Sequence, residues 1–202
     1  MSLHELIQKR RTIRRFKQIP LEEDILWRIV DCARLAPSAM NLQPLEYLII
    51  NDPVKVAQVF PLTRWAGYLP KEQGFPPPGQ EPVAYILVLI NEALAKGWER
   101  HDVGAAVQNM ILCALEHGIG ACWLGSLNKD EARRLFHIPT QYEVDSALAL
   151  GYPDEEPVAV PLQDSVKYFK DETGRLHVPK RALETVAHYN HFSKQFIIAE
   201  EL

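Results

Sequence analysis

The chain has 202 residues, which is enough for one domain or two small ones with a substantial buried core. Hydrophobic residues make up 47% of the sequence and charged residues 24%, values that are ordinary for a soluble globular protein. The net charge of −4 argues against a protein whose main partner is nucleic acid or an anionic membrane.

The N-terminal part of the chain predicts helices around one strand. Ser2 is the predicted N-cap of a short helix that ends near a cluster of arginines. Residues 21–35 predict a second helix, because apolar residues recur there at i, i+3 and i+4 and acidic residues fill its first turn. A loop at 36–41, a strand at 46–50 and a short helix at 53–60 are expected to follow.

Residues 61–82 predict an irregular segment, because seven glycines and prolines between positions 67 and 79 interrupt it. Trp65, Tyr68 and Phe75 lie within this segment. Long irregular segments inside a compact domain are more often binding loops or lids than linkers. The three aromatic side chains either line a substrate pocket or anchor the loop, and the sequence leaves both interpretations open.

The second half of the chain mixes strands and helices. Residues 83–90 are continuously apolar, which predicts a strand that is buried on both faces but is far too short to span a bilayer. A helix is expected at about 102–117, closed by Gly118, followed by a strand at 121–124 and a helix that Asn128 caps. Another strand is expected at 143–150. These alternating elements predict a single α+β domain over residues 1–202.

The tail after Asp164 is less regular. A helical stretch is expected at residues 182–188. Beyond it lies an apolar cluster that comprises Phe192, Phe196, Ile197 and Ile198. Because exposed apolar patches mark contacts with other chains, this end is expected to form an arm over a partner subunit.

Five cations stand within seven positions at residues 9–15, and we call residues 10–16 the arginine segment. Such a cluster repels itself unless an anion lies among its members, and arginine suits the bidentate binding of a phosphate. The alternative is a solvated basic patch or a weak nucleic-acid contact. Arg15 is expected to be either exposed or paired with an acid.

The sequence gives only weak signs of other catalytic or metal-binding chemistry. The sequence contains no recognisable catalytic triad, metalloprotease motif or phosphate-binding G-x-x-x-x-G-K-[ST] loop. His188 and His191 are three residues apart, but no third ligand is evident, so a surface face is expected instead of a metal site. Single cysteines at positions 32, 113 and 122 and the lack of a signal core predict reduced thiols in a cytoplasmic protein.

Four segments together resemble the nitroreductase family of flavin-dependent oxidoreductases. They are R-R-T-I-R-R-F at residues 10–16, A-P-S-A-M-N-L-Q-P at 36–44, G-I-G-A-C-W-L-G at 118–125 and A-L-G-Y-P at 149–153. Each is weak alone, but their order and spacing resemble the family specifically. The resemblance implies a three-layer α+β sandwich with a central, mostly antiparallel sheet flanked by helices, and a C-terminal arm at 182–202 that is exchanged in a homodimer.

The resemblance also implies site residues for FMN. The first motif holds the flavin phosphate in the family, which here assigns that role to Arg10, Arg11, Thr12 and Arg14. The second motif approaches the flavin from the partner subunit and here comprises Pro37, Ser38, Ala39, Met40 and Asn41. The third runs beside the isoalloxazine ring and here comprises Trp123, Leu124, Gly125 and Ser126. A basic residue near the C-terminus commonly completes the phosphate site, and Arg181 next to Lys180 is the best match.

Two positions depart from the family pattern. Gly125 stands where many members carry a glutamate that orients nicotinamide or flavin, and Leu45 stands where a tryptophan often follows Gln-Pro. The substrate-covering helical excursion of the family is replaced here by the irregular segment at 61–82.

The activity implied by the resemblance is the transfer of hydride from NAD(P)H through flavin N5 to an acceptor by a ping-pong mechanism. Nitroaromatics, quinones and other conjugated small molecules are the expected acceptors. The flavin carries this chemistry, so no catalytic side chain is predicted. One alternative is a protein that binds or handles FMN without turnover, and another is a nucleic-acid-binding protein that uses the arginine segment.

Overall fold

The computed structural model describes residues 2–192. The chain forms two compact units, one that ends at Glu155 and one that begins at Glu156. The single domain expected over residues 1–202 stays a prediction. Of the expected C-terminal arm, residues 193–202 lie outside the described residues, as do Phe196, Ile197 and Ile198 of the apolar cluster.

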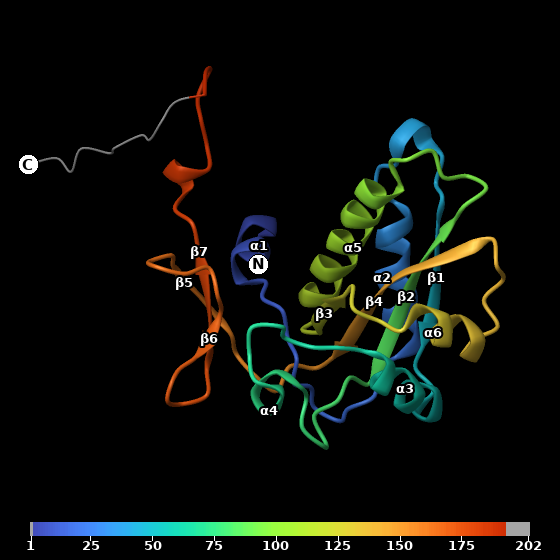
Figure 1. Cartoon of the computed structure of the whole chain (residues 1–202), viewed down its shortest axis with the longest axis horizontal. Coiled ribbons are helices and arrows are strands. Elements are labelled where there is room, and N and C mark those ends of the chain that lie inside the picture. The colour runs from blue at the N-terminus through green and yellow to red at the C-terminus, as the bar shows by residue number, and fades with distance from the viewer. Residues whose placement is uncertain (1, 193–202) are drawn as a thin grey trace, which may run out of the picture. The chain divides into compact units, whose positions relative to one another are not determined.

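The first unit is built on a four-stranded antiparallel sheet (Figure 1). Its spatial order is β1-β2-β4-β3, and the strands are β1 (Leu45–Ile50), β2 (Ala84–Asn91), β4 (Tyr142–Gly151) and β3 (Gly120–Leu124). All three strand pairs are antiparallel. This arrangement confirms the predicted antiparallel sheet and leaves β1 and β3 at its two edges.

Six α-helices and two 3₁₀ turns accompany this sheet in the described part of the first unit. The helices are α1 (Leu3–Lys9), α2 (Glu23–Arg34), α3 (Pro53–Val59), α4 (Lys71–Gly74), α5 (Glu99–Glu116) and α6 (Lys129–Leu135). The 3₁₀ turns are η1 (Ala39–Asn41) and η2 (Phe60–Leu62). The predicted caps are confirmed, because the side chains of Ser2 and Asn128 accept hydrogen bonds from the first turns of α1 and α6. Helix α5 begins three residues earlier than predicted.

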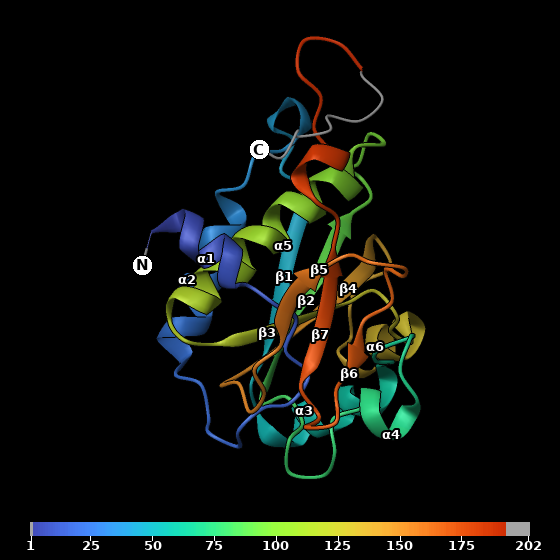
Figure 2. The same cartoon turned by 90° about the vertical axis from the view of Figure 1, so that its left-hand side faces the viewer.

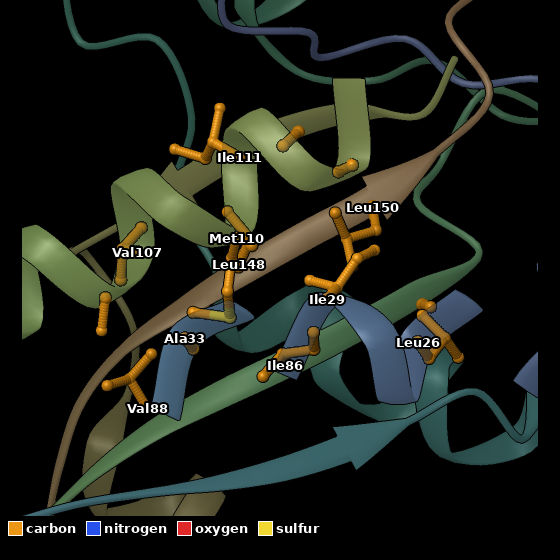
Figure 3. Close-up of a cluster of buried hydrophobic side chains, with 14 of the residues drawn as sticks. Leu26, Ile29, Ala33, Ile86, Val88, Val107, Met110, Ile111, Leu148 and Leu150 are labelled. Carbon is orange, nitrogen blue, oxygen red and sulfur yellow. The ribbon is translucent and has the colours of Figure 1, made fainter. Parts of the chain in front are cut away.

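The alternation of side chains along β2 explains why its sequence is apolar throughout. Ile86, Val88 and Ile90 belong to a buried cluster with α2 and α5, which run beside each other in both views (Figures 1 and 2). Tyr85 and Leu87 belong to a second cluster on the opposite face, with residues of α3 and α6. Figure 3 shows the first cluster, with side chains of α2 and α5 packed over β2 and β4. Helices therefore cover both faces, as the sandwich prediction requires.

The segment at 61–82 is irregular apart from η2 and the short α4, as predicted. Trp65 is buried and donates a hydrogen bond to Thr63, and its ring lies 6.2 Å from that of Phe60. Phe75 packs edge-on against the same Phe60 ring. Trp65 and Phe75 therefore anchor the loop, whereas Tyr68 is exposed. Whether the segment also covers a substrate stays a prediction.

The second unit contains a three-stranded sheet that the sequence analysis did not predict. Its order is β5-β7-β6, with β5 (Val158–Pro161), β7 (Leu176–Lys180) and β6 (Phe169–Lys170). The signal was obscured because prolines end β5 and lie inside β7, and proline normally argues against a strand. The helix expected at 182–188 is wrong: the structure forms only the 3₁₀ turn η3 (Leu183–Thr185). The β-branched Thr185 and Val186 disfavour its continuation.

Candidate functional site

The arginine segment lies along the free edge of strand β3. The backbone N–H of Ile13 donates to the carbonyl of Ala121 at 3.0 Å, and that of Lys17 donates to the carbonyl of Tyr152 at 2.8 Å. Asp154 in turn donates its N–H to the carbonyl of Arg15 at 2.9 Å. These bonds bring together the first, third and fourth motifs, which are far apart in the sequence.

Two glycines allow this close approach. Gly120 of β3 and Gly151 of β4 are direct partners in the strand register. A Cβ atom at Gly120 would lie 2.8 Å from the Cβ of Ile13, and one at Gly151 would lie 2.9 Å from the Cβ of Phe16. Both separations are too short for carbon atoms. Any residue other than glycine at positions 120 and 151 would therefore clash with the arginine segment.

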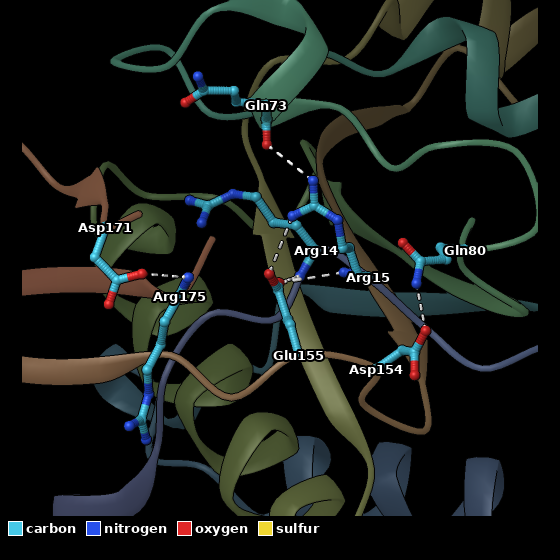
Figure 4. Close-up of polar contacts among 8 residues, drawn as sticks. All are labelled: Arg14, Arg15, Gln73, Gln80, Asp154, Glu155, Asp171 and Arg175. Carbon is cyan, nitrogen blue, oxygen red and sulfur yellow. Dashed lines mark hydrogen bonds and ion pairs between the residues drawn. The ribbon is translucent and has the colours of Figure 1, made fainter. Parts of the chain in front are cut away.

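A half-buried carboxylate holds the cationic part of this segment (Figure 4). Glu155 Oε1 accepts hydrogen bonds from the backbone N–H groups of Arg14, at 2.5 Å, and Arg15, at 3.2 Å. Its Oε2 pairs with the guanidinium of Arg15 at 3.4 Å. A second guanidinium nitrogen of Arg15 donates to the carbonyl of Gln73. Arg15 is thus paired with an acid, one of the two expected outcomes.

The other arginines of the segment differ in their surroundings. The Arg11 guanidinium turns back and donates to the carbonyls of Arg10 and Gln8. Burial, followed by the positive charge of Arg10, lowers the pKa of Arg11. Arg10, Thr12 and Arg14 are half-buried beside it. A concentration of positive charge that repels itself in this way is suited to receive an anion.

The third motif continues from the same strand. Leu124 is buried, whereas the Trp123 side chain is 45% exposed, with its indole N–H donating to Ser146 Oγ at 2.8 Å. Around Gly125, the space that a Cβ would occupy has no atom within 4 Å. The carbonyl of Ser126 accepts a hydrogen bond from Arg64. The strand thus leads into an open backbone stretch, which fits a flat ring that needs access to N–H groups.

The second motif folds into a tight loop at residues 38–43, which we call the 38–43 loop. Met40, Asn41 and Gln43 have φ angles of 53°, 54° and 50°, in the left-handed region that non-glycine residues rarely adopt. The Met40 side chain is 86% exposed. Pro37 and Asn41 are exposed too, and Ser38 and Ala39 are half-buried. The loop therefore presents its tip outward.

The loop and the arginine segment lie at opposite ends of the sheet. The loop is next to the end of β2, where Asn91 donates its N–H to the carbonyl of Pro44. The arginine segment is level with the start of β2, because Ala121 is opposite Leu150 and Leu150 is opposite Ala84. Strand β2 has eight residues, so its ends are about 24 Å apart at roughly 3.4 Å per residue. One chain therefore does not bring these two motifs together.

Arg181 belongs to the second unit, where its guanidinium donates to the carbonyl of Thr185 at 2.6 Å. Its expected role beside the phosphate stays a prediction. Sequence reasoning missed two acids that support the predicted site, Glu155 and Asp102. Glu155 lies two residues after the A-L-G-Y-P motif, which is the one signal that marked its neighbourhood. Asp102 lies in the first turn of α5, and its carboxylate accepts a hydrogen bond from Ala39 N–H.

A cavity of about 410 Å³ lies elsewhere in the first unit. Its walls are mostly apolar and come from the segment after Phe16, from α3 and η2, and from the residues just before β2; they include Leu21, Val56, Phe60 and Val83. None of the predicted flavin residues lines it. Among residues 2–192, no helix has the length and hydropathy of a membrane span, and no three potential metal ligands converge.

An antiparallel sheet with helices on both faces and a cationic segment along one edge strand defines an α+β sandwich protein. The anion site expected at this segment stays a prediction. The chain matches the family model "Nitroreductase family" over residues 7–152, and it belongs to that family. The predicted family membership and the predicted α+β sandwich are confirmed, and the exchange of the C-terminal arm stays a prediction.

Similar proteins agree with this assignment. A Methanothermobacter thermautotrophicus protein named "Putative NADH dehydrogenase/NAD(P)H nitroreductase" is 31% identical, over 78% of this chain and 80% of that protein. An iodotyrosine deiodinase from Thermotoga neapolitana is 28% identical, over 76% of this chain and 89% of that protein. A solved structure of "a putative nitroreductase in complex with FMN" from Desulfovibrio desulfuricans has a TM-score of 0.65 and 25% identity, covering 81% of this chain and 92% of that one.

Proposed function

We propose that the protein is an FMN-dependent oxidoreductase that takes hydride from NAD(P)H and reduces a conjugated small molecule, such as a nitroaromatic or a quinone, in a ping-pong sequence. The observation that carries this proposal is the docking of the arginine segment against β3, the strand that leads into the open backbone at Gly125. The nicotinamide cofactors in the names of relatives and the FMN in a solved relative support the same conclusion.

The residues present fit FMN. Half-buried Arg10, Thr12 and Arg14 provide cations and a hydroxyl for the phosphate, and Arg11 joins them if it exchanges its backbone carbonyls for phosphate oxygens. The backbone from Trp123 to Ser126 would lie beside the ring system. The bound flavin would supply the acceptor for hydride and the donor for the second substrate.

The chain's own residues therefore bind and orient instead of transferring protons. Glu155 keeps the backbone of Arg14 in place and pairs with Arg15, so the segment retains its shape although its cations repel one another. Gly125 leaves room on one side of the open backbone, where a nicotinamide or acceptor ring has space to stack.

A homodimer in the cytoplasm completes the proposal. The arginine segment and the 38–43 loop lie level with opposite ends of β2, which is about 24 Å long, so we infer that a flavin in contact with both needs two chains. The 38–43 loop would then serve the flavin of the partner subunit. Cys32, Cys113 and Cys122 are all free, which fits a reducing compartment.

The direct test is the visible spectrum of the purified full-length protein with FMN, before and after NADH or NADPH is added under anaerobic conditions. We expect a protein-bound flavin spectrum that bleaches on reduction and returns when a quinone is added. If titrated FMN keeps the spectrum and fluorescence of free flavin, the proposal is wrong.

A second candidate is an FMN-binding protein without turnover. Gly125 favours it, because the glutamate that many family members carry is missing from an otherwise open position. Stopped-flow mixing of the FMN-loaded protein with NADH and with NADPH separates the two. Bleaching within seconds supports the oxidoreductase, and bound flavin that stays oxidised with both nucleotides supports the binding protein.

A further inference from the structure

The 38–43 loop has a backbone conformation that its sequence does not favour. Met40, Asn41 and Gln43 all have positive φ angles near 50°, and none of them is glycine. Residues held in this region each raise the energy of the chain, and they persist when surrounding contacts fix them. Something outside these three residues must therefore hold the loop.

Local hydrogen bonds close the loop on itself. Ser38 Oγ accepts from the N–H of Gln43 at 3.0 Å, and the carbonyl of Ser38 accepts from the N–H of Asn41 at 3.0 Å. These bonds set the shape of the turn. They do not attach it to the helices beneath.

That attachment comes from Asp102 of α5. Its Oδ1 accepts the N–H of Ala39, the first residue of the turn, at 3.1 Å, across 63 positions of sequence. Asp102 is only 6% exposed, and it is one of three buried polar or charged residues among those that the structure describes. Burying a carboxylate is costly unless it is hydrogen-bonded. Its position in the first turn of α5 also places the negative charge at the favourable end of the helix dipole.

Asp102 shares a small cavity with residues from both ends of the 38–43 loop. A small cavity of about 150 Å³ is lined by Asp102 together with Ser38, Gln43 and Tyr47. Burial, and then the charge of Asp102, raise the pKa of the Tyr47 phenol to about 12. Asp102 therefore contacts the loop at Ala39 and borders the same cavity as Ser38 and Gln43, the two ends of the loop.

We propose that Asp102 is a positioning residue, which holds the 38–43 loop in its left-handed conformation from helix α5 and so presents Asn41 and its neighbours to the flavin. The claim that the loop contacts the flavin rests on the proposed function. The hydrogen bond from Ala39 to Asp102 is present in the chain without any cofactor, and its effect on the loop can be tested separately.

The first experiment measures amide hydrogen exchange in the full-length protein without added nucleotide. Asp102→Leu removes the acceptor, and we expect exchange at residues 39–43 to become at least tenfold faster. Asp102→Asn keeps an oxygen in place and should restore most of the protection. Glu99→Gln is the matched control, because it removes another acid from the first turn of α5 that does not contact the loop.

The second experiment measures FMN affinity by flavin fluorescence in the same variants. A lost hydrogen bond to a charged group corresponds to a Kd about ten- to a hundredfold higher, so Asp102→Leu should weaken binding by that factor. Asp102→Asn should restore Kd to within a few-fold of the wild-type value. Circular dichroism confirms folding, and Asp102→Ala replaces Asp102→Leu if the latter does not fold, since water can enter from the adjoining cavity.

Each outcome decides one claim. Unchanged exchange at residues 39–43 in Asp102→Leu, or in Asp102→Ala where it replaces that variant, shows that Asp102 does not hold the loop. Faster exchange with an unchanged FMN Kd overturns its role in presenting the loop. A wild-type protein that does not bind FMN overturns the proposed function, while the exchange result still decides whether Asp102 fixes the loop.

Discussion

The arginine segment and the 38–43 loop lie at opposite ends of one sheet and are held by different physical means. The arginine segment is fixed by backbone hydrogen bonds to β3 and by close packing on Gly120 and Gly151. The 38–43 loop is held by side-chain acceptors against its own backbone strain. Glu155 also holds the arginine segment, so this segment is sensitive both to added volume at the two glycines and to loss of that carboxylate. The 38–43 loop is sensitive to the loss of its side-chain acceptors.

Gly120→Ala tests the packing of the arginine segment and should give the largest effect on stability at neutral pH. The added Cβ meets the Cβ of Ile13, which cannot move without its backbone. Overpacking of this kind lowers the free energy of unfolding by about 1–3 kcal/mol, measured by urea denaturation. Gly67→Ala is the control, because its Cβ meets nothing within 4 Å. Equal stability of the two variants would show that the arginine segment is not packed on glycine.

Arg14→Ala and Arg15→Ala separate the roles of adjacent cations. Loss of a charged hydrogen bond to phosphate weakens FMN binding by about 1.5–3 kcal/mol, so Arg14→Ala should raise Kd about ten- to a hundredfold. Arg15 is paired with Glu155, and its removal should change Kd less than threefold. Fluorescence titration measures both values. A larger effect at Arg15 than at Arg14 would contradict the assignment.

The buried Cys122 in β3 should make the free energy of unfolding depend on pH. Burial raises the pKa of its thiol from 9.0 to about 12. The unfolded chain therefore loses the Cys122 proton near pH 9, whereas the folded chain keeps it. The contribution of Cys122 to the free energy of unfolding is constant below pH 9 and declines as the pH rises toward 12. The free energy of unfolding should fall by up to roughly 1.4 kcal/mol per pH unit in that window. Cys122→Ala should flatten this decline, and an identical slope in both proteins would refute it.

Gly125→Glu should have the smallest effect on folding. The side chain enters open space, so the free energy of unfolding should stay within about 0.5 kcal/mol of the wild-type value. Urea denaturation checks this expectation, and stopped-flow reduction by NADH shows what the restored family residue does. A strong destabilisation would mean that the backbone at Gly125 is not open.

The features of the fold that the sequence could predict are those that depend on local patterns along the chain. The buried strand at residues 83–90 and the helix stop at Gly118 follow from local patterns of hydropathy and backbone freedom, and both are confirmed. The role of Gly120 and Gly151 depends on strand register, which pairs residues 31 positions apart. Asp102 and Glu155 belong to no spacing pattern, and Glu155 stands between two other acids, Asp154 and Glu156, so only the folded chain shows what they hold.

The most direct test of the account is complementation between two variants in a mixed dimer. Arg14→Ala disables the arginine segment, and Asn41→Ala disables the 38–43 loop, so each homodimer should bind FMN weakly at a concentration just above the wild-type Kd. If each flavin contacts both ends through two chains, the mixed dimer has one intact site and should bind about one FMN. A mixed dimer that binds no more FMN than either parent would contradict a site assembled from two chains.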